Sequence, residues 1–163
     1  MIFITLGSQK FQFNRLLKEV DELIENGVIK DKVFAQIGYS DYAPVNFEFK
    51  EFLDRNEFAS VMNSSNLIIT HGGTGAIIGA VKKGKKVIAV PRLAQYGEHV
   101  DDHQIQLIKQ FDDLGIIEPC YDCVDLSKAY LTSTNKIYST YISNTMKIIN
   151  NIDNYLQEDK SNG

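Results

Sequence analysis

The fold of this chain is decided by the stretch LIITHGGTGAII, which runs from Leu67 to Ile78. An apolar run ends in His71, and a glycine-rich turn then leads into a second apolar run with the spacing of a helix. A parallel strand passes into a helix in this way at phosphate sites. Glycine lets the backbone approach a ligand, and a helix start offers unpaired N–H groups and the positive end of a dipole. The stretch therefore predicts an anion-binding turn in an α/β fold.

Apolar runs alternate with helical patterns on both sides of this stretch. Strands are expected at Ile2–Leu6, Val33–Ile37, Phe47–Phe49, Leu67–Thr70, Val87–Val90 and Ile116–Ile117. Helices are expected at Phe13–Glu25, Asp54–Asn63 (with Asp54 as N-cap), Thr74–Lys83, His99–Phe111, Leu126–Thr132 and Ile137–Leu156. Strands that are apolar throughout indicate a sheet covered on both faces, and short links favour a right-handed α/β sandwich. We expect one domain over residues 1–156 and a polar tail over residues 157–163.

Composition places the chain among globular proteins. It has 163 residues, of which 44% are hydrophobic and 23% charged, and this fits one domain with its own core. The formal net charge of -4 argues against a nucleic-acid partner, so any bound anion must be held by local groups. The first residues enter a strand pattern without a charged leader, and no apolar stretch approaches the roughly 20 residues of a membrane span. We expect a cytoplasmic protein that meets the membrane through a surface patch or a partner.

The two cysteines, Cys120 and Cys123, form a C-x-x-C pair. A zinc site needs a second pair or histidine partners nearby, and a thioredoxin-type motif opens a helix early in its fold. This pair lies late in the chain and has neither context. We expect reduced thiols without a metal or redox role.

The glycine-rich turn has two interpretations. It is either a tight strand–helix turn with Thr74 as N-cap, or a site where the N–H groups of Gly72 to Gly75 and the Thr74 hydroxyl hold a diphosphate. Three glycines in four positions exceed the needs of a cap, which favours the second interpretation. His71 is either a buried, hydrogen-bonded histidine at a strand end or a neutral donor beside a phosphate. The turn matches neither a Walker A motif nor a GxGxxG fingerprint.

A second loop, Pro91–Gln104, follows the next apolar run. It gathers polar groups that suit a hydroxyl-rich ligand such as a sugar or ribose: Glu98, His99, Asp101, Asp102, His103 and Gln104. Acids in a helix start also complement its dipole, and His99 with His103 has the spacing of a metal pair, but polyol contacts explain the cluster equally well. Arg92 is either a phosphate counter-charge or a surface residue. The Gly7-Ser8-Gln9 loop after the first strand is expected to face the same crevice.

The two motifs resemble those of the donor-binding, C-terminal half of the GT-B glycosyltransferases of family 28. The resemblance is carried by T-H-G-G-T-G-A-I at Thr70–Ile77 and by P-R-x-x-x-Y-G-E-H-V-D-D-H-Q at Pro91–Gln104. It is closest to small bacterial subunits of capsular and exopolysaccharide synthesis, which are similar to the catalytic subunit of the two-part UDP-GlcNAc transferase of N-glycan assembly. The family implies a Rossmann-like parallel-sheet sandwich that is one half of a two-half enzyme. The acceptor-binding half would be a separate, membrane-associated chain.

The resemblance also implies a site. Gly72, Gly73, Thr74 and Gly75 would line the UDP diphosphate, His103 and Gln104 would reach the donor sugar with Asp102 beside them, and Gly7 and Ser8 would border the cleft. With His71, Arg92 and Glu98 added, these are the expected substrate-binding residues. Many relatives hold the ribose with a carboxylate where this chain has Gly79, so Glu98, Asp101 or backbone and water would replace it.

The implied activity is inverting transfer of a hexose from a UDP-sugar to a lipid-linked acceptor in surface polysaccharide synthesis. Galactose is the first expectation for the sugar and GlcNAc the second. Helix-start amides would stabilise the leaving UDP without an obligatory metal or cofactor, and no D-x-D motif is present. The candidates for the general base are His71, Glu98 and His103, or a group on the partner chain.

The alternative is a non-catalytic partner that stabilises or enhances a separate transferase. The helix expected at Ile137–Leu156 has a broad apolar arc, which would pack on the sheet or in part on a partner. The partner itself would hold this chain at the inner face of the membrane.

Overall fold

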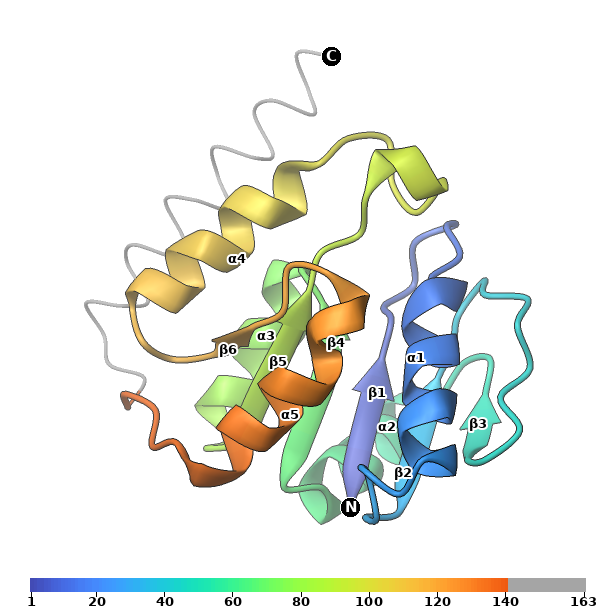
Figure 1. The fold of residues 1–163 in the computed structure, drawn as a ribbon, viewed down its shortest axis with the longest axis horizontal. Helices are drawn as coiled ribbons and strands as arrows, with labels where there is room; N and C mark the ends of the chain where they lie inside the picture. The colour runs from blue at the N-terminus through green and yellow to red at the C-terminus, as the bar shows by residue number, and fades with distance from the viewer. Residues whose placement is uncertain (141–163) are drawn as a thin grey trace.

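The structure is a computed structural model that describes residues 1–140. Six parallel strands form one sheet in the order β3-β2-β1-β4-β5-β6 (Figure 1). The strands are β1 (Ile2–Thr5), β2 (Val33–Gln36), β3 (Glu48–Lys50), β4 (Leu67–His71), β5 (Lys86–Val90) and β6 (Glu118–Pro119). The order reverses direction between β1 and β4, and α/β sheets bind ligands beyond the carboxyl ends of the strands at such a switch point.

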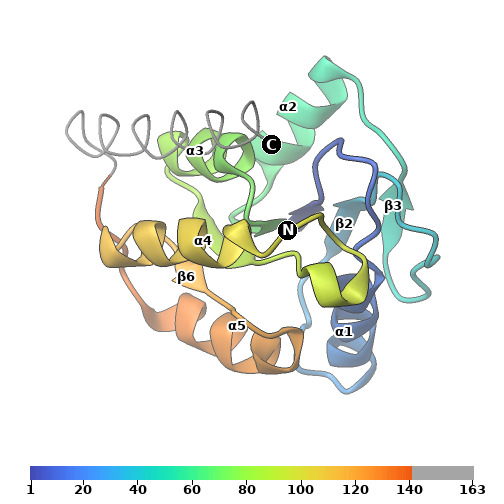
Figure 2. The ribbon, with the colours of Figure 1, turned by 90° about the horizontal axis from the view of Figure 1, so that it is seen from above.

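Helices cover both faces of the sheet (Figure 2). They are α1 (Asn14–Glu25), α2 (Arg55–Ser64), α3 (Thr74–Lys82), α4 (His103–Asp113) and α5 (Leu126–Asn135), with short 3-10 turns η1 (Ala94–Tyr96) and η2 (Cys123–Asp125). Apolar residues of α1 and α5 pack on one face, and those of α2, α3 and α4 pack on the other. Neighbouring residues of β1 point to opposite faces of the sheet. Ile2 packs with α1 and α5, and Phe3 packs with α2, α3 and α4. The prediction of a doubly covered parallel sheet is therefore confirmed.

The capping box of α2 confirms one predicted helix start. The side chain of Asp54 accepts the N–H of Glu57 at 2.8 Å, and the Glu57 side chain accepts the N–H of Asp54 at 3.1 Å. Each carboxylate thereby satisfies an N–H group that the helix itself leaves unpaired.

One other predicted helix start and one predicted N-cap are wrong. Helix α4 begins at His103 rather than His99, because the Asp101 carboxylate accepts the His103 N–H at 3.1 Å and ends the preceding loop there. The N-cap of α3 is Gly73 rather than Thr74, and no side chain caps this helix. The first turn of α3 is thus left open where β4 ends.

The predictions for the last third of the chain need further correction. The last strand is Glu118–Pro119 rather than Ile116–Ile117, because Gly115, with a φ of 71°, makes the turn that ends the α4 region just before Ile116. Residues 137–140 are not helical. The rest of the helix predicted at Ile137–Leu156, and the tail, lie outside the described residues. Within residues 1–140, no helix has the length and apolar character needed to cross a membrane.

Candidate functional site

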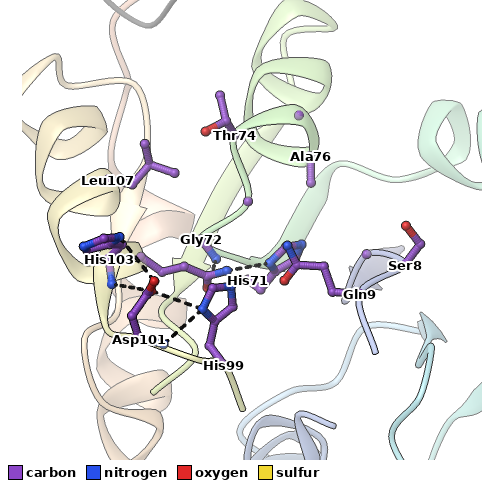
Figure 3. Close-up of a pocket in the computed structure, with 14 residues that line it drawn as sticks. Ser8, Gln9, His71, Gly72, Thr74, Ala76, His99, Asp101, His103 and Leu107 are labelled. Carbon is purple, nitrogen blue, oxygen red and sulfur yellow. Dashed lines mark hydrogen bonds and ion pairs between the residues drawn. The ribbon is translucent and has the colours of Figure 1, made fainter. Parts of the chain in front are cut away.

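A pocket of about 340 Å³ opens at the carboxyl ends of β1 and β4, where the strand order reverses (Figure 3). It is lined by Gly7, Ser8, Gln9, His71, Gly72, Gly73, Thr74, Gly75, Ala76, His99, Asp101, His103, Gln104 and Leu107. The loop after β1, the glycine turn before α3 and the start of α4 therefore meet at one place. Nine of the twelve expected substrate-binding residues lie in this lining, and Arg92, Glu98 and Asp102 do not.

Glycine at two positions makes room for the ring of His71. A Cβ atom on Gly7 or on Gly73 would lie 2.7 Å from His71 Nε2, which is closer than real Cβ contacts allow. Gly7 also has a φ of 71°, a conformation that other residues rarely adopt. The imidazole packs between the two glycines, and a larger residue at either position would displace the ring.

Gln104 connects the elements around the pocket. Its Oε1 atom accepts the N–H of Gly72 at 3.0 Å and that of Arg92 at 2.9 Å, and its Nε2 atom lies 3.2 Å from His71 Nδ1. The N–H of Gly72 is therefore not free for a diphosphate, in contrast to the expectation, and the free amides of the turn begin at Gly73. One Nε2 hydrogen of Gln104 remains for a ligand.

His71 is neutral and its tautomer is fixed. Burial, followed by the positive charges of Arg92 and His99, lowers the pKa of His71 to about 3. Because both lone pairs of Gln104 Oε1 are taken by backbone N–H groups, Gln104 must present its amide N–H to His71 Nδ1. Nε2 of His71 therefore carries the hydrogen. The prediction of a buried, hydrogen-bonded histidine is confirmed.

Arg92 lies beneath the pocket. It is 1% exposed, and its guanidinium donates to the carbonyl oxygens of Leu6, Phe11, Gln12 and Glu98. The interpretation as a surface residue is wrong, and the carbonyls rather than a pocket ligand occupy its terminal NH₂ groups. Burial lowers the pKa of Arg92 to about 10, against the opposing charge of Glu98. Arg92 thus ties the loop after β1 to the loop after β5.

Glu98 is also buried away from the pocket, at 0% exposure. Its carboxylate accepts from Arg15 Nη2 at 3.0 Å, from Arg15 Nε at 3.1 Å and from the N–H of Leu93 at 3.0 Å. Asp102 instead accepts the N–H of Ala94 at 2.8 Å. The prediction that Glu98 and Asp102 contact the substrate is therefore wrong, because each carboxylate instead holds the backbone of its own loop.

Asp101 stands between two histidines at the mouth of the pocket. Its Oδ1 atom lies 3.1 Å from His99 Nδ1, and its Oδ2 atom lies 3.3 Å from His103 Nδ1 (Figure 3). The side chain of His99 is 7% exposed and that of His103 is 42% exposed. His99 was not among the expected substrate contacts, and Asp101 was expected only as one possible replacement for the ribose carboxylate, although the sequence shows both in the polar cluster.

Three further lining residues were missed: Gln9, Ala76 and Leu107. Gln9 belongs to the loop that was expected to face the crevice, and Leu107 is one helical turn beyond His103, a spacing that places both on one face of α4. Ala76 has no chemical signal in the sequence.

A second cavity of about 310 Å³ adjoins the first on the α2 side of α3. It shares Gly7, Ser8, Gly75 and Ala76 with the first pocket and continues past Gly79. A Cβ atom on Gly79 would meet nothing within 4 Å, so the missing side chain leaves open space there.

Neither a metal cluster nor a disulfide is found in residues 1–140. No group of three His, Cys, Asp or Glu residues in this part of the chain has the arrangement to hold a metal ion. Cys120 and Cys123 are buried free thiols. Burial raises the pKa of each thiol to about 12, so neither is a reactive thiolate at neutral pH.

Comparison with known proteins gives one family. The model of the glycosyltransferase family 28 C-terminal domain matches residues 1–158. Among solved structures, MurG of Acinetobacter baumannii superposes with a TM-score of 0.56 and 22% identity, over 82% of this chain and 41% of MurG. The glycotransferase of kitacinnamycin superposes with a TM-score of 0.60 and 18% identity, over 83% of this chain and 35% of that one. Both likenesses concern the fold, and this chain spans about two fifths of their length or less. No curated protein sequence matches this one.

Proposed function

The chain belongs to the glycosyltransferase family 28 C-terminal domain family, and from this premise we propose that it is the donor-binding half of a two-chain, inverting glycosyltransferase. In this proposal it transfers a hexose from a UDP-sugar to a lipid-linked acceptor in the synthesis of a surface polysaccharide. UDP-galactose is the favoured donor and UDP-GlcNAc the second.

The observation that carries the proposal is the open start of α3 inside the pocket. No side chain caps this helix, and the turn before it lines the pocket. The N–H groups of Gly73, Thr74 and Gly75, with the Thr74 hydroxyl, would receive the diphosphate. The helix dipole favours negative charge there, and the neutral Nε2–H of His71 would add a donor. Helix-start amides stabilise a leaving diphosphate without a required metal or cofactor.

The two ends of the donor would then lie on either side of this turn. The sugar would face Asp101, His103 and the remaining N–H of Gln104, because carboxylates and amides match hydroxyl groups. The nucleoside would extend into the second cavity beside Gly79. Glu98 does not take the role of the missing ribose carboxylate, because its oxygens are held by Arg15 and Leu93.

The acceptor side is inferred from the family resemblance. A membrane-associated partner chain would bind the lipid-linked sugar and would hold this chain at the cytoplasmic face of the membrane. Reaction requires both halves, because alignment of the reactants and exclusion of water depend on closing the site from both sides.

Titration calorimetry with UDP on Gly75 variants tests the diphosphate site. A Cβ atom at Gly75 would meet nothing within 4 Å, so Gly75→Ala, Gly75→Asn and Gly75→Asp all fit the fold. An aspartate in the first turn favours the helix but places a carboxylate where the diphosphate binds. We expect Gly75→Asp to weaken UDP binding by about tenfold or more, since roughly 1.4 kcal/mol of repulsion is sufficient.

Gly75→Ala and Gly75→Asn are the matched controls, because they add bulk without charge. Equal loss in all three variants would contradict an electrostatic role for the turn. Absence of UDP binding by the wild-type chain would favour the alternative, a non-catalytic partner of another transferase.

A further inference from the structure

Gln9 is the pocket residue whose side chain the fold leaves without a partner. Its Oε1 atom is buried and has no hydrogen-bond partner, and the residue lines the first pocket. Within residues 1–140, one other buried side-chain polar atom lacks a partner, Arg92 Nε, and Arg92 lies outside the pocket lining. Buried polar groups in proteins are almost always paired. An unpaired one in a pocket lining therefore calls for a ligand atom or a water molecule as its partner.

The loop that carries Gln9 is held by hydrogen bonds on both sides of this residue. The guanidinium of Arg92 donates to the carbonyl oxygens of three residues that flank it: Leu6, Phe11 and Gln12. These contacts set the position of the loop backbone before any ligand binds. Gln9 thus presents its amide from a fixed point, as selective recognition of a small ligand requires.

The place of Gln9 in the pocket indicates which part of the donor it meets. Gly7 and Ser8 of the same loop line both cavities, whereas Gln9 lines the first and not the second. Its side chain extends into the pocket from the side opposite to Asp101 and His103 (Figure 3). In the proposed function, the nucleoside occupies the second cavity and the sugar faces Asp101 and His103. Gln9 would therefore lie across from them, beside the sugar.

An unpaired amide at this place suits a hydroxyl group better than a phosphate. A hydroxyl donates to an amide oxygen and accepts from an amide N–H, so it satisfies Gln9 whichever way the amide is turned. A phosphate oxygen at neutral pH only accepts, and it would leave Oε1 unpaired. The glycine turn already offers N–H donors for the diphosphate, so an additional acceptor serves the hydroxyl groups of the sugar.

We propose that Gln9 is a specificity residue for the transferred hexose, whose side-chain amide forms a hydrogen bond with a hydroxyl of the donor sugar. The proposal rests on the function proposed above and deepens it, because it names a contact that distinguishes a UDP-hexose from UDP. The sugar is then held between two amides, Gln9 from the loop after β1 and Gln104 from the start of α4.

Titration calorimetry on the whole chain compares UDP, UDP-galactose and UDP-GlcNAc. Gln9→Met keeps the length of the side chain and removes its hydrogen-bonding atoms. Gln110→Met, the same change at an exposed position of α4, is the matched control. We expect Gln9→Met to weaken binding of the UDP-hexose that the wild type prefers by about tenfold, the upper range for one hydrogen bond between neutral groups, while UDP affinity stays within about twofold.

Gln9→Glu distinguishes a hydroxyl from the diphosphate as the group that Gln9 binds. A carboxylate still accepts from a hydroxyl, but it repels a diphosphate. The ratio of UDP-hexose affinity to UDP affinity removes the effect of that repulsion, because both ligands carry the diphosphate. We expect Gln9→Glu to keep this ratio and Gln9→Met to lose it.

A series of UDP-hexoses that each lack one hydroxyl identifies the group that Gln9 contacts. One analogue should bind the wild type about tenfold more weakly than the complete UDP-hexose does, and should bind Gln9→Met as well as the complete UDP-hexose does. Additive losses for every analogue would contradict a direct contact.

Unchanged UDP-hexose affinity in Gln9→Met would overturn the proposal. A changed free energy of unfolding in urea would then assign the amide to a buried water. Equal weakening of UDP and UDP-hexose would overturn it as well, because the contact would lie on the UDP part. Both results leave the donor site intact. If the wild-type chain binds neither UDP nor a UDP-hexose, the proposed function itself fails, and the contact of Gln9 with it.

Discussion

At the scale of single residues, Gln104 decides what the glycine turn offers to a ligand. Its amide occupies the N–H of Gly72, supports the loop at Arg92 and fixes the tautomer of His71. Only a side chain with both an acceptor and a donor can do this, so Gln104→Glu would lose the contact to His71 Nδ1 in its present form. The position of one amide therefore sets the hydrogen bonding of two pocket residues, Gly72 and His71, and of the Arg92 N–H behind them.

The buried neutral His71 predicts a pH dependence of stability. Its pKa of about 3 in the folded chain lies below the ordinary value of 6.5. The unfolded chain therefore binds more protons at acidic pH, and stability is lost as the pH falls from about 6.5 toward 3, by at most about 1.4 kcal/mol per pH unit. Urea unfolding of the wild type and of His71→Asn at pH 7 and at pH 4.5 should show the steeper loss in the wild type. Parallel pH profiles would contradict the assignment.

At the scale of elements, two helix starts serve different purposes. Helix α2 begins with a reciprocal capping box, whereas α3 begins at a bare glycine. A cap would stabilise α3, but it would also occupy the N–H groups that an anion needs. The capping box stabilises α2, whereas the first N–H groups of α3 have no side-chain cap and stay available to a ligand.

Asp54→Ala is expected to lower the free energy of unfolding by about 1 kcal/mol, because it removes one half of the capping box. UDP affinity should not change, since Asp54 lies outside the pocket lining. Gly75→Asp should show the opposite combination, with unchanged or higher stability and lost binding. Denaturant titration and calorimetry on both variants check this pair, and a loss of both properties in either variant would contradict the division.

Sequence patterns located β1, β2, β4 and β5 and the double cover of the sheet, because buried parallel strands are continuous apolar runs. They placed the last strand two residues too early, because Gly115 makes a turn just before Ile116. They misplaced the start of α4 by four residues, since the contact of the Asp101 carboxylate with the His103 N–H depends on loop geometry. They placed Gly7, Ser8 and the turn at one edge of the sheet correctly. They did not predict that Arg92 and Glu98 turn away from the pocket, because their partners lie up to 86 residues away in the chain.

At the scale of the whole molecule, the net charge does not favour the binding of an anion at the candidate site. The chain carries a net charge of -4, and no Lys or Arg is found in the pocket lining given by residues 1–140. In the proposed function, neutral N–H groups, a helix dipole and the neutral imidazole of His71 are the groups that would face the diphosphate. Binding is therefore expected to depend on local geometry rather than on the overall field of the protein.

The acidic net charge and the lack of Lys and Arg in the pocket lining together predict an unusual response of UDP binding to salt. Raising NaCl from about 50 mM to about 500 mM should leave UDP affinity unchanged or slightly higher, because salt screens the repulsion between UDP and the acidic protein. Calorimetry across that range, with potassium acetate as a second salt, provides the measurement. A steep fall in affinity would show that a lysine or arginine from elsewhere in the chain contacts the diphosphate.

The buried Arg92 has a consequence for the order in which the chain acquires its parts. Its partners Leu6, Phe11 and Gln12 lie 80 to 86 residues before it, so these bonds form only after β1 and β5 have joined the same sheet. Contacts between such distant segments form at a high cost in loop-closure entropy and therefore late. A folding intermediate that contains only β4 and α3 would possess the glycine turn but no finished pocket. Recovery of UDP binding during refolding would thus report completion of the topology rather than formation of the turn.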